Sequence, residues 1–335
     1  MATPRITELL GRERTISVEL WPPRSPAAEA SLEAALVELE QLRPAFASIT
    51  YGAGGSTRER THELVLRIAR RGRTVPMAHL VCAAHTRAEL VEILSGYHAA
   101  GIRNVLALRG DPPLDAGGPV PAGELRHAIE LVELAKQVGD FCVAVAAHPE
   151  GHPDSIDEES DLEYLAAKLE VADVAITQFF FGAADYCTLV DRLSRRGSHR
   201  PVIPGIMPIT NVRTISRMAE MSGSSVPAEL ADRVHAVADR PEEVRKIGIE
   251  AATSLCEQLL AAGAPGLHFY TMNQSRATIE ICANLGIWPG PGPASRLGPG
   301  PAPRPGPGPG PAPGSADSTA GAASGPGTAA GADGR

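Results

Sequence analysis

Glu19 is the residue that most clearly offers acid–base chemistry, because it is a lone carboxyl between Val18 and Leu20 in a short apolar run. A carboxyl withdrawn from water tends to keep its proton near neutral pH, and a protonated carboxyl can act as a general acid. A buried glutamate paired with Arg or Lys would give the same pattern, and structural ion pairs also perturb pKa values. From the residues alone, the proton donor and the ion pair are equally supported.

Other polar residues follow apolar runs in the same way. The glycine-rich segment 52–56 offers backbone N–H groups to a phosphate, although a plain turn capped by Ser56 explains it as well. Arg109-Gly110-Asp111 sets a cation and an anion beside a glycine, which suits a ligand with donors and acceptors, or a local salt bridge. The amide of Gln178 could pair with the edge of a planar heterocycle.

Three histidines, His79, His148 and His152, follow or end such runs, and imidazole is a common metal ligand. None of them belongs to an H-E-x-x-H pair, and no cysteine or carboxylate cluster joins them at ligand spacing. We therefore expect no metal site and expect these rings to form hydrogen bonds to a cofactor or within their loops.

These residues need a frame that brings the ends of many strands together. Short β-branched and apolar runs alternate with helical patterns, which is typical of βαβ units and a parallel sheet. The predicted strands are Ile16–Leu20, Phe46–Thr50, Pro76–Val81, Asn104–Leu108, Phe141–Ala146, Val174–Phe179, Val202–Ile206 and Gly266–Tyr270.

Helical segments separate these strands. Ser56, Thr86 and Ser160 each stand three residues before a Glu, which predicts capping boxes at three helix starts. Residues 28–42 and 242–260 have helical apolar spacing, and residues 275–285 supply a helix after the last strand.

Eight strands, each followed by a helix, predict an α/β fold of the (β/α)8 TIM barrel type. A doubly wound open sheet is the alternative, but it usually has a G-x-G-x-x-G turn after the first strand. Residues 19–23, at that turn, contain no glycine. In a barrel the active site lies at the carboxyl ends of the strands, where the polar residues above stand.

The chain beyond residue 288 differs in composition, since it is almost wholly Pro, Gly, Ala and Ser. Such a segment buries too little apolar surface to offset the entropy of ordering. We predict a barrel domain over residues 1–288 and a disordered Pro/Gly/Ala-rich tail over residues 289–335.

Composition excludes several classes of protein. The formal net charge of -8 and the lack of a basic stripe argue against nucleic-acid binding. Five scattered cysteines without a C-x-x-C pair suit reduced thiols. We find neither a signal-peptide pattern nor a long apolar stretch, and therefore expect a cytoplasmic protein that does not enter membranes.

Several long blocks of the sequence are similar to one known family. They read SVELWPP, SITYGAGGSTRERT, MAHLVC, GIRNVLALRGDPP, HPEGHPDS, AITQFFF, IPGIMPITN and GLHFYTMNQSRATI. Over roughly residues 8 to 286 the chain resembles methylenetetrahydrofolate reductase of the bacterial type, which has the catalytic domain alone.

The resemblance implies a barrel that binds FAD non-covalently and takes electrons from NADH or NADPH. It then implies reduction of 5,10-methylenetetrahydrofolate to 5-methyltetrahydrofolate by ping-pong kinetics, which supplies methyl groups for methionine synthesis. It further implies a small-molecule folate substrate and a homo-oligomer.

Carried over by position, Glu19 matches the family's acid, which would protonate a folate nitrogen and open the ring to an iminium. Asp111 matches a carboxylate near flavin and pterin, with a catalytic, flavin-tuning and substrate-holding role, and Gln178 matches an amide that contacts folate and nicotinamide. Gln274 stands at a further substrate-contacting position. The other flavin-contacting positions are Thr50, Tyr51, Ala53, His79, Arg109, Gly110, Ala128, His148, His152, Asp161 and Lys168.

The sequence also departs from the family at positions around the expected ligands. His127 and His148 replace aromatic residues, Met218 replaces a Phe of some members, and Gln274 replaces an Arg. These changes keep open two alternatives to the reductase: a flavin-binding barrel with another substrate, and a non-catalytic accessory subunit.

Overall fold

The computed structural model describes residues 2–10, 15–52, 58–83, 85–110, 123–213 and 223–287. The predicted tail, residues 289–335, lies outside these ranges, so its disorder and the domain boundary at 288/289 stay predictions. None of the helices in the described ranges has the length and apolar character that a membrane crossing requires.

Eight parallel strands form a closed barrel in which each strand pairs with the next and the last pairs with the first. The predicted (β/α)8 fold is therefore confirmed, and the strand bounds differ from the predicted ones by at most one residue. The strands are β1 (Thr15–Leu20), β2 (Phe46–Ile49), β3 (Val75–Val81), β4 (Asn104–Leu108), β5 (Cys142–Ala147), β6 (Val174–Phe179), β7 (Val202–Ile206) and β8 (Gly266–Tyr270).

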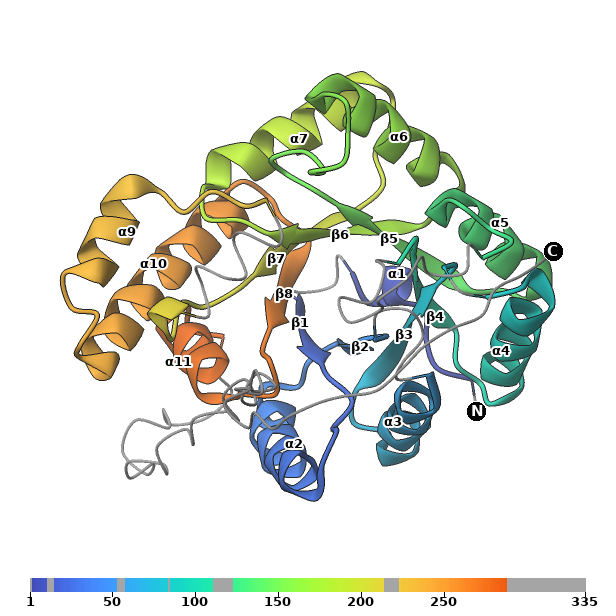
Figure 1. Ribbon diagram of the computed structural model, residues 1–335, viewed down its shortest axis with the longest axis horizontal. Helices are drawn as coiled ribbons and strands as arrows, with labels where there is room; N and C mark the ends of the chain where they lie inside the picture. The colour runs from blue at the N-terminus through green and yellow to red at the C-terminus, as the bar shows by residue number, and fades with distance from the viewer. Residues whose placement is uncertain are drawn as a thin grey trace, which may run out of the picture. The chain divides into compact units, whose positions relative to one another are not determined.

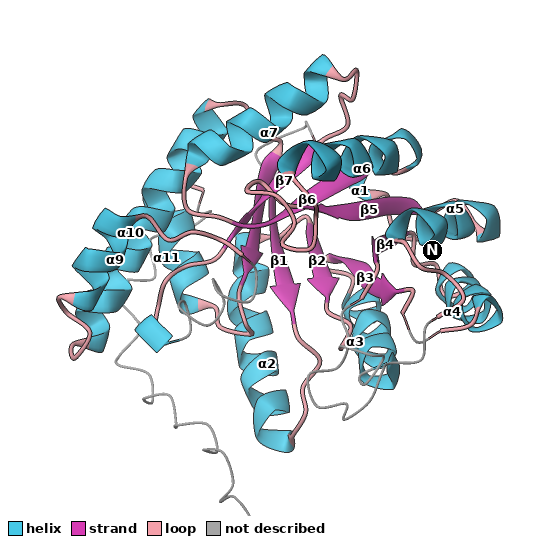
Figure 2. Cartoon of the chain, turned by 45° about the horizontal axis from the view of Figure 1, so that its top comes forward, coloured by secondary structure: helices cyan, strands magenta, loops and turns pink. Residues whose placement is uncertain are grey.

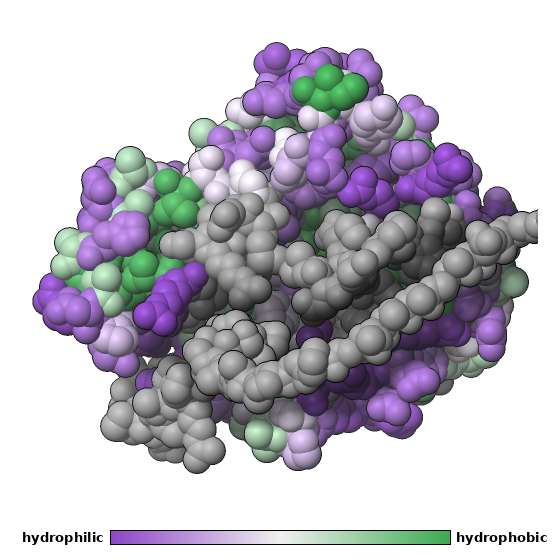
Figure 3. Space-filling model, in the orientation of Figure 1, coloured by the Kyte–Doolittle hydropathy of each residue, from purple (hydrophilic) through white to green (hydrophobic). Residues whose placement is uncertain are grey.

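Helices surround the barrel as an outer ring (Figures 1 and 2). Figure 3 shows hydrophilic side chains over most of the visible rim, and a group of apolar ones over α9 and α10. The helices are α1 (Ile6–Leu9), α2 (Pro26–Leu39), α3 (Arg58–Arg71), α4 (Arg87–Ala99), α5 (Ala128–Val138), α6 (Glu158–Val171), α7 (Ala183–Arg195), α9 (Ala228–His235), α10 (Pro241–Ala261) and α11 (Arg276–Asn284), with a 3-10 turn η1 (Glu40–Leu42) after α2.

Two of the three predicted helix caps can be compared with the structure. Thr86 forms the predicted capping box with Glu89 at the start of α4. The predicted box at Ser160 is wrong, because α6 begins earlier and Asp157 is its N-cap, with Oδ1 accepting from the Ser160 N–H at 2.8 Å. Asp and Ser are comparably good N-caps, so the apolar pattern alone could not choose between them. Ser56 lies outside the described residues.

The strands alternate side chains between two cores. One set points outward and packs against the ring of helices, as Val18 and Leu20 do. The other set, which includes Phe46 and Met77, fills the barrel interior together with Ile6 of α1. Below, the amino ends of the strands are called the floor of the barrel, and the carboxyl ends are called its mouth.

Helix α1 lies against the floor. The side chain of Asn104, at the start of β4, holds it by accepting from the Ile6 N–H at 2.9 Å and by donating to the Pro4 carbonyl at 2.9 Å. Ile6 is fully buried in the interior core. The interior is therefore packed from below, which leaves the mouth as the end that can admit a ligand.

Candidate active site

A cavity of about 260 Å³ lies at the mouth, where the carboxyl ends of the strands converge. Apolar walls come from β4, β5 and β6, including Leu106 and Ile176. Polar groups come from β1, β3, β6 and β8 and from the segments after β1, β2 and β5. The cavity thus combines a dry wall with a few polar side chains, as small-molecule sites commonly do. Six predicted site residues line it: Glu19, Thr50, Tyr51, His79, His148 and Gln178.

Glu19 points into this cavity from β1 and is 8% exposed. Burial raises the pKa of its carboxyl from 4.5 to about 7, and a hydrogen bond from the indole of Trp21 to Oε1, at 3.0 Å, partly opposes that rise. Among the described residues no Arg or Lys forms an ion pair with Glu19. The basic side chain that does approach it is His79, whose Nε2 lies 3.9 Å from Oε2 of Glu19. The structural ion pair that the sequence left open is therefore not found, and Glu19 has the environment of a general acid.

His79, on β3, is the second buried titratable group of the cavity. Burial lowers the pKa of its imidazole to about 3, so the ring is neutral at physiological pH. Its Nε2 is buried and has no hydrogen-bond partner among the residues that the structure describes. Because an unpaired buried polar atom is costly, this nitrogen is suited to pair with a ligand in the cavity.

His268 and Tyr270, on β8, also line the cavity, and the sequence analysis did not single them out. The imidazole of His268 is held from both sides, at 2.8 Å between Nδ1 and the Ser17 hydroxyl and 3.3 Å between Nε2 and the Ser48 hydroxyl. Tyr270 donates its hydroxyl to the Thr177 carbonyl at 2.7 Å. Alternate spacing along β8 was the available signal, since it puts both side chains on one face.

Tyr51, His148 and Gln178 differ in how firmly they are held. The hydroxyl of Tyr51 lies 3.0 Å from Nε2 of His85. The ring of His148 stands edge-on to that of His152, 4.6 Å away, and burial lowers its pKa to about 4. The side-chain Oε1 of Gln178 accepts from the Phe179 N–H at 3.0 Å, which directs this amide at the end of β6.

Arg109, Asp161 and Lys168, three further predicted cofactor positions, are not among the residues that line the cavity. Arg109 forms an ion pair with Asp154 at 2.8 Å, and the local salt bridge considered for it, with Asp111, lies outside the described residues. Asp161 accepts from the His152 N–H at 3.2 Å and so orders the loop after β5. Lys168 donates to the Ala146 carbonyl at 3.1 Å, and burial lowers the pKa of its ammonium group.

Gly110 is required by its backbone. Its φ is +88°, and a Cβ there would approach the Cβ of Val81 to 2.9 Å. Ala128 is the first residue of α5, and Gln274 is exposed in the turn before α11. Ala53, Asp111 and Met218 lie outside the described residues.

The described residues hold no group of three or more metal-ligating side chains. The site is thus an acid in an apolar cavity with neutral imidazoles beside it. A family model for methylenetetrahydrofolate reductase matches residues 5–286, which is most of the chain. The chain belongs to the methylenetetrahydrofolate reductase family.

Individual relatives agree with this assignment. The chain is 36% identical to 5,10-methylenetetrahydrofolate reductase of Pectobacterium carotovorum over 285 residues, covering 85% of this chain and 94% of the relative. It is also 36% identical to the Escherichia coli reductase over 276 residues, covering 82% and 92%. The Arabidopsis thaliana enzyme is 35% identical to this chain, and the match covers 82% of this chain and 49% of that enzyme. As a methylenetetrahydrofolate reductase homologue, the chain is an oxidoreductase of folate one-carbon metabolism.

Among solved structures, an uncharacterized protein from Clostridium thermocellum that binds two copies of 5-methyl-5,6,7,8-tetrahydrofolic acid superposes with a TM-score of 0.58. The similarity covers 84% of this chain and 96% of that one at 16% identity. At that identity it supports the barrel fold and nothing finer.

Proposed function

We propose that this member of the family catalyses the reduction of 5,10-methylenetetrahydrofolate to 5-methyltetrahydrofolate with electrons from NADH or NADPH. The observation that carries the proposal is Glu19. Its carboxyl is buried in the mouth cavity, no Arg or Lys of the described ranges forms an ion pair with it, and its pKa of about 7 lets it be protonated at physiological pH. Opening the folate ring requires a proton on a ring nitrogen, and such a carboxyl can supply it.

The residues at the mouth fit a bound flavin. The unpaired Nε2 of His79 could satisfy a polar atom of a planar ring, and the walls at Leu106 and Ile176 suit its apolar face. Bound FAD would supply the two-electron redox chemistry that links NAD(P)H to the folate. We propose that the cofactor-contacting residues are Thr50, Tyr51, Ala53, His79, Arg109, Gly110, Asp111, Ala128, His148, His152, Asp161 and Lys168.

The other side chains have supporting roles in the proposal. Gln178 is directed by its contact with the Phe179 N–H, which leaves the amide nitrogen for a substrate edge. Asp111 and Gln274 are proposed as further folate contacts. The apolar walls exclude water around Glu19, and this keeps its proton in place until the substrate takes it.

The test is to follow the two half-reactions of Glu19→Gln separately under anaerobic conditions. Reduction of the flavin by NADH or NADPH should proceed at the parental rate, because that step needs no proton from Glu19. Reoxidation by methylenetetrahydrofolate should slow by about 10²–10⁴-fold, the usual contribution of a general acid. Unimpaired reoxidation would contradict the role assigned to Glu19.

The same two half-reactions, measured on the parent protein, distinguish the reductase from the two alternatives. A barrel with another substrate would be reduced by NAD(P)H yet reoxidised slowly by methylenetetrahydrofolate even with Glu19 intact. An accessory subunit would bind no flavin or would not be reduced. Light scattering of the purified chain tests the proposed homo-oligomer.

A further inference from the structure

Trp21 follows β1 directly and reaches back to the catalytic acid. Side chains two residues apart on an extended strand share a face, so the indole of Trp21 can lie beside the carboxyl of Glu19. The indole Nε1 donates to Oε1 of Glu19 at 3.0 Å. The ring itself lines the mouth cavity, and Trp21 is 39% exposed, which is unusual for so large an apolar side chain.

The backbone at this point is clamped by the loop after β8. The Trp21 N–H donates to Oδ1 of Asn273 at 2.8 Å, and Nδ2 of Asn273 donates to the Trp21 carbonyl at 2.9 Å. Thr271 donates its hydroxyl to the Glu19 carbonyl at 2.7 Å. Asn273 makes its two bonds from a left-handed conformation, with φ of 57°, which asparagine tolerates better than most residues. The indole is thus placed by a fixed backbone.

This contact also decides which oxygen of Glu19 can carry the proton. An indole N–H donates and never accepts, and the carbonyl oxygen of a neutral carboxyl accepts better than its hydroxyl oxygen, so this contact favours Oε1 as the unprotonated oxygen. The proton of the neutral acid then resides on Oε2, the oxygen that lies 3.9 Å from His79 Nε2.

We propose that Trp21 is a positioning residue for the Glu19 acid: its indole N–H holds Oε1 and so presents the transferable proton on Oε2 toward the cavity. The inference rests on the proposed function for the role of Glu19, but the contact itself can be tested without folate.

Other titratable groups face Glu19 from several strands, and all are neutral near pH 7. Burial lowers the pKa of His79 and of His268 to about 3 and that of His148 to about 4. It raises the pKa of Tyr51 to about 12 and that of Tyr270 well above its ordinary value. Between pH 5 and 9, Glu19 is therefore the group among these that changes charge.

The first experiment uses Trp21 as its own reporter. The chain has two tryptophans, Trp21 and Trp288, so Trp288→Phe leaves one emitter. We expect its fluorescence to titrate with a midpoint near 7, the pKa of Glu19, because the acceptor of the indole changes charge there. The same titration in Glu19→Gln with Trp288→Phe should be flat between pH 5 and 9. A flat curve with Glu19 intact would overturn the proposal.

The second experiment removes the donor with Trp21→Phe and measures flavin reoxidation by methylenetetrahydrofolate against pH. Loss of a donor that favours the carboxylate should move the alkaline limb upward by about one pH unit, and loss of orientation should lower the plateau by roughly tenfold. The pH dependence of flavin reduction by NAD(P)H should not shift with it, because that step takes no proton from Glu19. If Trp21 only supported the local fold, its loss would lower the rate without moving the alkaline limb. An unshifted limb would therefore contradict the positioning role of Trp21.

Asn273→Gly guards against a misfolded Trp21→Phe. Glycine keeps the positive φ but removes both bonds to the Trp21 backbone. We expect the limb to shift in the same direction by a smaller amount, and a limb that matches the parent would overturn the role of the clamp. If methylenetetrahydrofolate failed to reoxidise the parent protein, the proposed function would fail, and if it reoxidised Glu19→Gln at the parental rate, the acid role of Glu19 would fail. In both cases the fluorescence titration would still decide whether Trp21 holds Glu19.

Discussion

At the floor of the barrel the charges of Glu40 and Lys136 are paired, whereas at the mouth the buried Glu19 and Lys168 form no ion pair with an oppositely charged Arg, Lys, Asp or Glu of the described residues. Glu40 contacts Arg71 at 2.7 Å below α2 and α3, and Lys136 pairs with Asp173 between β5 and β6. At the mouth, Glu19 has a neutral imidazole as its nearest partner and Lys168 donates to a carbonyl. Within the described residues, opposite ends of one barrel therefore treat similar side chains differently.

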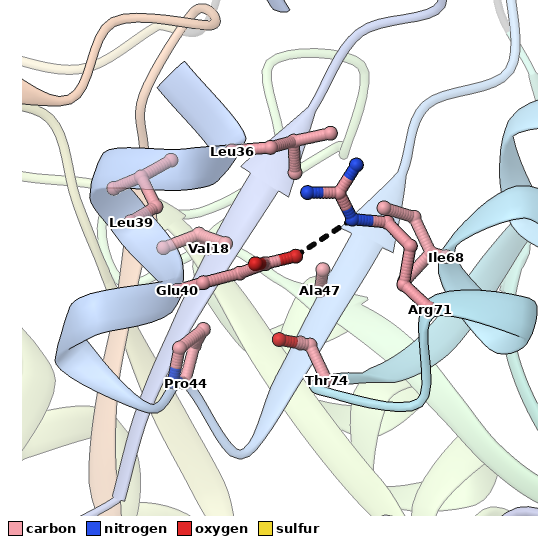
Figure 4. Close-up of a pocket in the computed structure, with 9 residues that line it drawn as sticks. All are labelled: Val18, Leu36, Leu39, Glu40, Pro44, Ala47, Ile68, Arg71 and Thr74. Carbon is pink, nitrogen blue, oxygen red and sulfur yellow. Dashed lines mark hydrogen bonds and ion pairs between the residues drawn. The ribbon is translucent and has the colours of Figure 1, made fainter. Parts of the chain in front are cut away.

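Figure 4 shows the floor arrangement, with Glu40 and Arg71 joined among the apolar side chains of Val18, Leu36 and Ile68. The cavity there is about 10 Å³, room for a single water molecule at most. An ion pair in such a tight place holds the loops that lead into β2 and β3. At the mouth, the cavity is far larger and the unpaired carboxyl costs stability, which is the pattern expected where chemistry and not folding sets the residue.

The largest effect on stability is expected from Glu19→Gln. The folded-state pKa of about 7 lies above the ordinary 4.5, so the folded protein holds a proton that the unfolded chain has released. Stability is therefore lost as pH rises from 4.5 to 7, by about 3 kcal/mol in all. Gln carries no charge, and the variant should unfold at higher urea concentration than the parent at pH 8.5.

The control for this prediction is the pH dependence of the stability difference between Glu19→Gln and the parent. About one pH unit below the ordinary pKa of 4.5 the carboxyl is protonated in both states, and the two unfolding midpoints should converge. Flavin content must be equal in both samples, since bound ligand also stabilises. A variant less stable than the parent at pH 8.5 would mean that the buried carboxyl has a stabilising partner after all.

The same replacement at the floor should act in the opposite direction. Glu40→Gln removes a carboxylate that pairs with Arg71 and lies 3.6 Å from Arg73, and the side chain of Glu40 is only 13% exposed. We expect the free energy of unfolding to fall by about 1–2 kcal/mol, because a partly buried hydrogen bond between charged groups stabilises more than an exposed ion pair does. Urea unfolding at pH 7 measures it, and a gain in stability would erase the contrast between floor and mouth.

The sequence predicted the barrel well because its signals are local. An apolar run such as Val202–Ile206 can be recognised without knowing which strand pairs with it. The capping box of Thr86 and Glu89 likewise lies within four consecutive residues. The position of Glu19 at the mouth followed from the strand order alone. The exact cap of α6 did not, because Asp157 and Ser160 are equally suited to the role.

The contacts around the acid were not predictable in the same way. Trp21 meets Asn273, and Ser17 meets His268, across about 250 residues of chain that only barrel closure brings together. His268 lies inside a predicted strand, whereas the candidate site residues were expected at the carboxyl ends of the strands. Its inward direction becomes evident only once β8 is paired with β1.

The smallest effect is expected from Ser17→Ala, which removes an uncharged hydrogen bond to His268, a residue that lines the mouth cavity. Ser17 and His268 form a neutral contact at 2.8 Å, and the pKa of about 3 keeps the imidazole uncharged above pH 5. The variant should lose about 1 kcal/mol, the net value of one buried hydrogen bond. That loss should be the same at pH 5 and pH 9, unlike the growing gain of Glu19→Gln. If the Ser17→Ala difference also changed with pH, His268 and Glu19 would titrate as one coupled unit, and the cost at the mouth would belong to the network and not to Glu19.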